Sequence, residues 1–400
     1  MAYLFLRELS KLDLSLDVYS NEEWTEFPEL LRTFDGKTKR CLSFPFEWEW
    51  NSWYGRNRKV AFVMSFIRRL PVHGKIVNKL LTEHKKAPYD AIIQFSQGEL
   101  FKLGKFASAV PIVLYPCVHA AGERRWCRRE VALSRVSEPW WWRWARDLYL
   151  GYRSLLQKRD YRRARGVIGM SRRFNRHVMT DYGIAADRLG VVYHPIEPPT
   201  THVEAPQSAD RNHIRLLFVG RISVRKGIEM LTELVPPLLL KDPGVEITVV
   251  GAASLWSDYE YLLKDLPKER CEWLRSLSND KVHAEMRRAD ILLVPSHYEP
   301  GGIVVGEALA NGMIIVASDE VGSAENLPRS VCRQFRRGDK EEFASKVEEA
   351  IADVRRGACP SREAVRAVAA QFFDPSAMTS LLLAETERLV SASVGNRDAK

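Results

Sequence analysis

Short apolar runs alternate with longer amphipathic stretches along most of this chain, and that alternation limits its possible folds more than any other feature. Runs rich in Val, Ile and Leu are typical of strands buried in a parallel sheet, and the amphipathic stretches are typical of helices that cover it. The predicted strands form two series: residues 14–19, 89–95, 111–115, 166–170 and 190–193, and then residues 214–219, 245–250, 291–294 and 313–317. The sequence therefore predicts an α/β protein with two sheets.

Two domains are expected, because 400 residues exceed what one hydrophobic core usually organises. The boundary is predicted in a Pro-rich stretch that begins at His194 and gives way to polar residues up to Asn212. We predict an N-terminal domain over residues 1–196, a C-terminal domain over 197–374, and a terminal helix and tail over 375–400. The helical part of that tail is expected to end near residue 390.

The opening of the chain departs from the alternating pattern. Residues 1–10 have the pattern of a helix that leads into the strand at 14–19, whereas a doubly wound sheet normally opens with a strand and a Gly-rich turn. The first domain is therefore expected to lack its opening strand and that turn. Two explanations stay open: a start codon placed too late, or a shortened variant with weak or no activity.

Composition and charge exclude several classes of protein. Hydrophobic residues at 46% and charged residues at 28% are typical of a globular chain. The six cysteines form no CxxC pair, so neither a zinc framework nor a disulfide scaffold is expected, and the reduced cytoplasm is the predicted location. No uncharged apolar stretch reaches the roughly 18 residues that a transmembrane helix needs. The net charge of +9 favours contact with polyanions.

A basic turn follows the predicted strand at 214–219. Gly220, Arg221 and Lys226 lie between that strand and an apolar-periodic helix, at the carboxyl end of the sheet, where α/β proteins usually bind ligands. An arginine can hold a diphosphate through two hydrogen bonds, and a lysine adds a point charge. A solvated surface turn has the same composition, so this segment alone leaves both interpretations open.

A second segment follows the strand at 291–294 and supplies complementary groups. Its glycine pair lets the backbone approach a ligand, and the first N–H groups of the next helix can bind phosphate or sugar oxygens. An eight-residue spacing predicts two glutamates on roughly one face of a helix, where they can accept hydrogen bonds from sugar hydroxyls. The predicted binding residues here are Glu299, Gly301, Gly302, Ile303, Val304 and Glu307. Together the two segments favour a nucleotide-sugar site over a surface turn and a solvated helix.

These two segments resemble the donor domain of GT-B glycosyltransferases of family 4, the glycosyl transferases group 1. The family's E-x7-E signature matches Glu299 and Glu307, and its G-R-x4-K pattern matches Gly220, Arg221 and Lys226. Residues 247–251, 286–290 and 295–296 also match in order and spacing, so the likeness is specific over residues 214–330.

The resemblance implies a GT-B fold, with two Rossmann-like doubly wound domains facing a central cleft. It also implies a retaining transfer from a nucleoside-diphosphate sugar, without a metal or other cofactor. Arg221 and Lys226 would stabilise the departing diphosphate, Glu299 would hold sugar hydroxyls, and Glu307 would hold the ribose.

Three further residues take roles only through the resemblance. The base would lie near Arg275 and Leu277, where Arg275 replaces a glycine common in the family. His119 follows the strand at 111–115, at the position where many relatives carry a histidine that faces the transferred sugar. A lone histidine after a strand is otherwise more often structural.

The segment 124–165 has the most unusual composition, with 13 Lys and Arg against 4 Asp and Glu, interleaved with tryptophans and tyrosines. It suits the surface of an anionic membrane, where a lipid-linked acceptor would be found. Tryptophans in the core with solvated arginines explain it equally well, and single-stranded nucleic acid is the least favoured interpretation. Residues 44–54 are also rich in aromatics and are expected to line an acceptor site, form a lid or pack in the core.

We therefore expect a hexosyltransferase that acts on a glycan or lipid-linked acceptor in surface polysaccharide, lipopolysaccharide or glycolipid assembly. It would be cytoplasmic, or peripheral at the cytoplasmic face of the membrane. The alternative is a catalytically silent GT-B-like protein that binds a nucleotide sugar or a partner transferase. A nucleic-acid-binding role ranks third.

Overall fold

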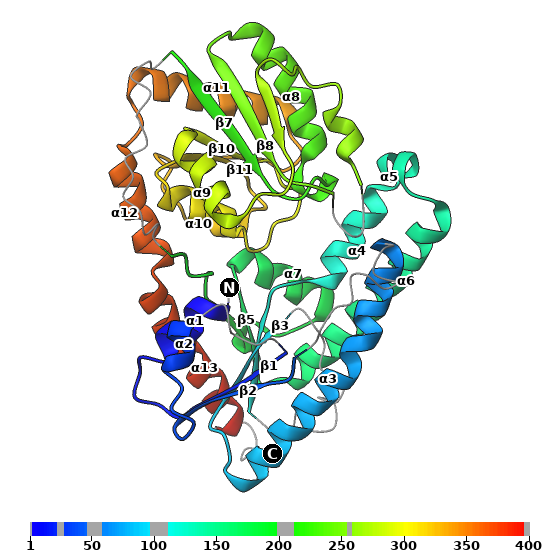
Figure 1. The fold of residues 1–400 in the computed structure, drawn as a ribbon, viewed down its shortest axis with the longest axis vertical. Coiled ribbons are helices and arrows are strands. Elements are labelled where there is room, and N and C mark those ends of the chain that lie inside the picture. Colours follow the sequence, from blue (N-terminus) through cyan, green and yellow to red (C-terminus); the bar gives the residue numbers. More distant parts are fainter. Residues whose placement is uncertain are drawn as a thin grey trace.

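The computed structural model describes residues 2–21, 28–45, 58–96, 111–197, 212–253 and 258–395. These residues form two α/β units, one above the other in Figure 1, with the C-terminal half of the chain in the upper unit. The segments 46–57 and 198–211, which include most of the predicted aromatic loop and of the linker, lie outside the described residues.

The C-terminal sheet has six parallel strands in the order β12-β11-β10-β7-β8-β9. Counted from its own first strand, this is the 3-2-1-4-5-6 order of a Rossmann sheet. The strands are β7 (Ile214–Val219), β8 (Val245–Val250), β9 (Cys271–Leu274), β10 (Ile291–Val294), β11 (Ile314–Ser318) and β12 (Cys332–Phe335). Every residue of β10 and β11 is buried, which explains their continuous apolar sequences.

Helices cover both faces of this sheet, as the amphipathic stretches predict (Figure 1). They are α8 (Ile228–Lys241), α9 (Asn279–Arg288), α10 (Ile303–Ala310), α11 (Lys340–Arg356) and α12 (Arg362–Phe373). Their buried side chains pack with those of the strands into one hydrophobic core that extends over the whole C-terminal unit.

The N-terminal unit contains a four-stranded parallel sheet in the order β3-β4-β5-β6. Its strands are β3 (Ile92–Ser96), β4 (Ile112–Pro116), β5 (Gly166–Gly169) and β6 (Leu189–Val191). The helices that come before the C-terminal unit in the chain are α1 (Ala2–Leu9), α2 (Pro28–Arg32), α3 (Arg58–Lys86), α4 (Ala120–Arg129), α5 (Val131–Ser137), α6 (Trp140–Arg163) and α7 (Arg172–Tyr182). None of the helices in the described ranges combines the length and the apolar character needed to cross a bilayer.

The strand predicted at 14–19 exists as β1 (Leu16–Ser20), but it does not join this sheet as a buried strand. It pairs in parallel with β2 (Lys39–Ser43) in a separate two-stranded sheet. The reason is its polarity: Asp17 accepts hydrogen bonds from Arg40 and, at 2.6 Å, from the Tyr89 hydroxyl. Such a strand cannot be buried on both faces of a core.

Helix α13 (Pro375–Gly395) packs on the N-terminal unit although it follows the C-terminal unit in the chain. It leaves α12 and descends along the lower unit (Figure 1). Leu382 and Leu389 are buried in one cluster with Phe5 of α1 and with Tyr115 of β4. The predicted helices at 1–10 and 375–390 are thereby confirmed, and together they cover one face of the four-stranded sheet.

Candidate functional site at the strand switch point

Both candidate segments lie where the strand order of the C-terminal sheet reverses. β7 and β10 are neighbours there, although β8 and β9 come between them in the chain. Open α/β sheets bind ligands beyond the carboxyl ends of their strands at this switch point. The loop 220–227 leaves β7 and the loop 295–302 leaves β10, so the fold brings the two predicted segments together.

The two loops are held against each other through their backbones. The His297 N–H donates to the Arg225 carbonyl oxygen at 2.9 Å. Gly227 begins α8 with a φ of 75°, and a Cβ atom there would lie 2.0 Å from the Pro295 carbonyl oxygen. Only glycine permits this approach. The contact fixes Lys226, the last residue of the short 3-10 helix η4 (Val224–Lys226), beside the second loop.

Glu299 is the centre of the site. Its side chain is 12% exposed and forms ion pairs with Lys226 and, at 3.6 Å, with Arg225. Its other carboxylate oxygen accepts the Gly302 N–H at 3.1 Å. Burial acts to raise the Glu299 pKa, but the two cations and these hydrogen bonds hold it below its usual range. The carboxylate is therefore ionised and fixed in orientation at neutral pH.

The start of α10 adds backbone donors to the site. Gly302 precedes the helix with a φ of 74°, and its N–H is occupied by Glu299. Ile303 and Val304 occupy the first helical turn, where N–H groups have no acceptor within the helix and attract anions. Of the predicted backbone donors, these two are therefore the ones suited to a phosphate oxygen.

Glu307 lies in the second turn of α10, but Glu299 lies outside the helix, in an extended bridge to Val321. The expectation that the two carboxylates share one helix face is therefore wrong. The reason is that the segment between them contains a left-handed glycine, which breaks the helical period. Glu307 is half-buried, and burial raises its pKa against the opposing effect of His283.

Residues 202–367 match the family model described as glycosyl transferases group 1. The match lies in the C-terminal unit, hereafter called the group 1 domain after the family that it resembles. An uncharacterized glycosyltransferase of Methanocaldococcus jannaschii is 27% identical over 41% of this chain and 45% of its own length. The gpi3 subunit of the phosphatidylinositol N-acetylglucosaminyltransferase of Schizosaccharomyces pombe is 28% identical over 37% of this chain and 32% of its own length. The chain thus spans less than half the length of either relative.

Solved structures extend the likeness to the whole chain. A sucrose-phosphate synthase from Thermosynechococcus elongatus has a TM-score of 0.65 at 15% identity, over 98% of this chain and 93% of that chain. Anabaena HepE in complex with UDP and glucose has a TM-score of 0.60 at 19% identity, over 96% of this chain and 94% of that chain. The predicted GT-B fold of two Rossmann-like domains is thereby confirmed. At these identities the structural likeness establishes the fold alone.

The group 1 domain places Arg221 and Gly220 beside Lys226. A Cβ atom on Gly220 would make ordinary contact with the Lys226 side chain at 3.7 Å, so the lysine stem lies over this glycine. Burial lowers the Lys226 pKa, Glu299 opposes that shift, and the charges of Arg225 and Arg221 add to it. Arg221 itself is exposed, so this region presents three neighbouring cations, one of them at the surface.

The predicted base-binding residues follow β9, at the edge of the group 1 domain. The Arg275 guanidinium lies 4.5 Å from the centre of the Trp273 ring and pairs with Glu260 at 2.8 Å. Leu277 is partly buried against the core. A role for these two residues in holding the base stays a prediction, and Trp273 adds an aromatic surface next to it that the motif did not indicate.

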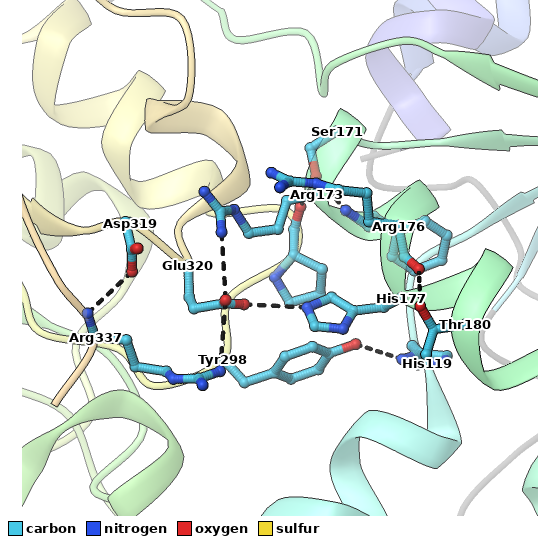
Figure 2. Close-up of polar contacts among 12 residues, drawn as sticks. His119, Ser171, Arg173, Arg176, His177, Thr180, Tyr298, Asp319, Glu320 and Arg337 are labelled. Carbon is cyan, nitrogen blue, oxygen red and sulfur yellow. Dashed lines mark hydrogen bonds and ion pairs between the residues drawn. The ribbon is translucent and has the colours of Figure 1, made fainter.

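His119 is buried in the contact between the two domains of the GT-B fold. One imidazole nitrogen lies 2.6 Å from the Tyr298 hydroxyl (Figure 2). The other lies 3.2 Å from an Asp181 carboxylate oxygen. Burial lowers its pKa, against the opposing effect of Asp181. Contact between His119 and a sugar stays a prediction, and in this arrangement the ring instead holds Tyr298, the residue before Glu299.

The sequence did not predict three residues near the site. Arg225 occupies a variable position of the G-R-x4-K pattern, and only its positive charge next to Lys226 could have indicated a role in the site. Tyr298 and His194 lie beside the site because the two domains contact each other there. A Cβ atom on Gly301 would lie 3.4 Å from the His194 ring, so this glycine lets the two domains approach. No local pattern signals contacts of that kind.

Proposed function

We propose that this chain is a nucleotide-sugar-dependent glycosyltransferase that transfers a sugar with retention to a glycan or lipid-linked acceptor. The observation that carries the proposal is the meeting of Lys226, Arg225 and Glu299 at the switch point of a group 1 domain. A fixed carboxylate suits sugar hydroxyls, and neighbouring cations suit a diphosphate. HepE, whose fold this chain shares, has been solved with UDP and glucose bound.

The proposed reaction develops negative charge on the departing diphosphate as its bond to the anomeric carbon breaks. Preorganised cations lower the barrier to such a step. Lys226 and Arg221 would take this role together with the first N–H groups of α10, while Glu299 accepts the sugar hydroxyls that replace Lys226 as its partner. Glu307 would hold the ribose, and Arg275 would lie near the base. No step in this proposal calls for a metal ion.

The proposed acceptor is a glycan or lipid in surface polysaccharide, lipopolysaccharide or glycolipid assembly. The relative from Schizosaccharomyces pombe is a subunit of a phosphatidylinositol N-acetylglucosaminyltransferase, which by its name acts on a lipid. The basic and aromatic segment 124–165 supports the same class of acceptor. A protein with this role would work at the cytoplasmic face of a membrane.

The test replaces Lys226 by Ala and, separately, Glu299 by Gln. Loss of one preorganised charge is expected to lower turnover by about 10²–10³-fold. Turnover is measured as release of the nucleoside diphosphate from UDP-, GDP-, ADP- and dTDP-sugars, in the presence and absence of EDTA. Lys241→Ala is the matched control, because Lys241 pairs with Glu348 on the exposed surface of the same domain.

Unchanged turnover in both site variants would contradict the proposed site. If a nucleotide sugar raises the melting temperature of the wild-type protein but no product forms, the chain is instead a silent binder of GT-B fold. A loss of turnover on adding EDTA would contradict the metal-independent reaction.

A further inference from the structure

The longest row of exposed apolar side chains among the described residues lies on one face of α6. The exposed fractions are 72% for Trp140, 63% for Trp144, 50% for Leu148, 48% for Tyr152 and 68% for Leu155. Steps of four and three residues return to the same side of a helix. The row therefore runs along one side of the helix for about 22 Å and turns gradually around it. Trp141, 49% exposed, widens its first turn.

The opposite face of α6 packs the helix against its own domain, and the exposed row takes no part in that packing. Trp142 and Leu150 are buried, and the buried Arg146 pairs with Glu138 at 2.8 Å. At the edge of the row, Asp147 binds Arg124 and Arg128 of α4, which packs alongside. The exposed tryptophans and leucines therefore make no large contribution to folding, and a monomeric protein rarely leaves such a stripe uncovered.

Basic side chains lie at both ends of the row. Arg162 and Arg163 are exposed in the last turn of α6, and Arg135 is exposed in α5 next to Val136, which is itself 69% exposed. Figure 1 shows α5 at the right-hand margin of the molecule and α6 running down beside the N-terminal unit. An anionic bilayer has negatively charged phosphates at its surface and acyl chains beneath them. The arginines at the ends of the row can pair with the phosphates while the apolar side chains enter the acyl layer.

We propose that this face of α6 is a membrane-docking surface for anionic lipid. Indole rings prefer the boundary between headgroups and acyl chains, and leucines enter the acyl layer. Single-stranded nucleic acid fits less well, because Leu148 and Leu155 occupy the middle of the row and offer no ring on which a base can stack. The surface goes beyond the proposed function, because docking needs neither donor nor turnover.

The test is co-sedimentation of the full chain with vesicles of phosphatidylcholine alone and of equal parts phosphatidylcholine and phosphatidylglycerol. The wild-type protein is expected to bind the anionic vesicles more strongly, and added salt is expected to weaken that binding. The triple variant Trp140→Ser, Trp144→Ser, Leu155→Ser is expected to lose about tenfold or more in affinity. Leu240→Ser is the matched control, because Leu240 is 86% exposed on the other domain.

A second variant, Arg162→Gln with Arg163→Gln, is expected to keep weak binding to neutral vesicles and to lose the preference for anionic ones. Thermal unfolding and stabilisation by nucleotide sugars are recorded for every variant, so that a folding defect or a failed donor site is distinguished from lost docking. Equal vesicle binding by the wild-type protein and the triple variant would overturn the proposal. So would a wild-type dimer that the triple variant converts to a monomer in sedimentation velocity, since this face would then join two copies.

Discussion

His194 is an ionisable residue that the fold buries where the two domains meet. The residue is 6% exposed, and its Nδ1 atom lies 2.9 Å from the Tyr115 hydroxyl. Burial lowers the pKa of His194 to about 3, so its ring is neutral at pH 7. In the unfolded chain His194 is exposed to water, so its pKa returns to the ordinary histidine value near 6.5.

Acidification is therefore expected to destabilise the protein before most carboxylates titrate. Between pH 6.5 and 3 the unfolded chain binds a proton at His194 and the folded chain does not. The free energy of unfolding should accordingly fall by about 1.4 kcal/mol for each pH unit from this residue alone. Urea unfolding at pH 7 and pH 5 measures the slope. His194→Gln should flatten it, whereas His213→Gln, at an exposed ion pair with Glu246, should not.

At the scale of elements, the turn between β7 and α8 is the structural feature on which the donor site depends. Two loops meet there because Gly227 has no side chain, and the same glycine adopts a left-handed backbone conformation. The charge of Lys226 reaches Glu299 only while this approach is kept. A side chain at position 227 would therefore disturb the site in two ways, by pushing the two loops apart and by straining the left-handed backbone. These two effects can be measured separately.

Gly227→Ala and Gly36→Ala make that separation. Their φ values are 75° and 74°, but a Cβ atom on Gly36 would have nothing within 4 Å. Gly36→Ala should cost about 1–2 kcal/mol of stability through its backbone conformation and leave donor binding unchanged. Gly227→Ala should cost more and also weaken stabilisation by nucleotide sugars, measured by thermal unfolding. Equal effects of the two variants would show that the loop contact is unimportant.

The sequence predicted the central strands of the C-terminal core well, because Val, Ile and Leu dominate each of them even where β7 and β8 contain one charged residue. It missed the edge strands β9 and β12, which are only four residues long and are interrupted by Glu272 and Arg333. It missed β2 for the same reason. The motif identified Lys226 and Glu299, whereas their interdomain neighbours could not be predicted: His119 and Tyr298 are 179 residues apart, and no local periodicity encodes such a contact.

At the scale of the whole molecule, the N-terminal domain forms hydrogen bonds with both loops that carry the site. The Ser171 hydroxyl donates to the Pro300 carbonyl oxygen at 2.7 Å, directly after Glu299. Glu130 accepts the Arg225 N–H at 3.0 Å, directly before Lys226. The placement of Lys226 and Glu299 is thereby coupled to how the two domains close on each other.

Glu320 offers a way to test this coupling away from the site. It lies in the C-terminal domain and contacts His177 at 3.0 Å and Arg173 at 3.3 Å across the interface (Figure 2). Glu320→Gln should weaken closure by about 1–3 kcal/mol. Small-angle scattering should then show a larger radius of gyration. Glu348→Gln, within one domain at an exposed pair, should leave the radius unchanged, and an unchanged radius in both variants would contradict the coupling.

The return of α13 to the first domain has a consequence for how the protein is made. Its packing is tight: a Cβ atom on Gly166 of β5 would lie 2.6 Å from Leu389. One face of the N-terminal sheet therefore stays uncovered until α13, which follows the C-terminal unit in the chain, has left the ribosome. Nascent domains usually mature in the order in which they emerge. Here the C-terminal unit can complete its core before α13 emerges, whereas the N-terminal unit depends on a helix that is synthesised after the C-terminal unit.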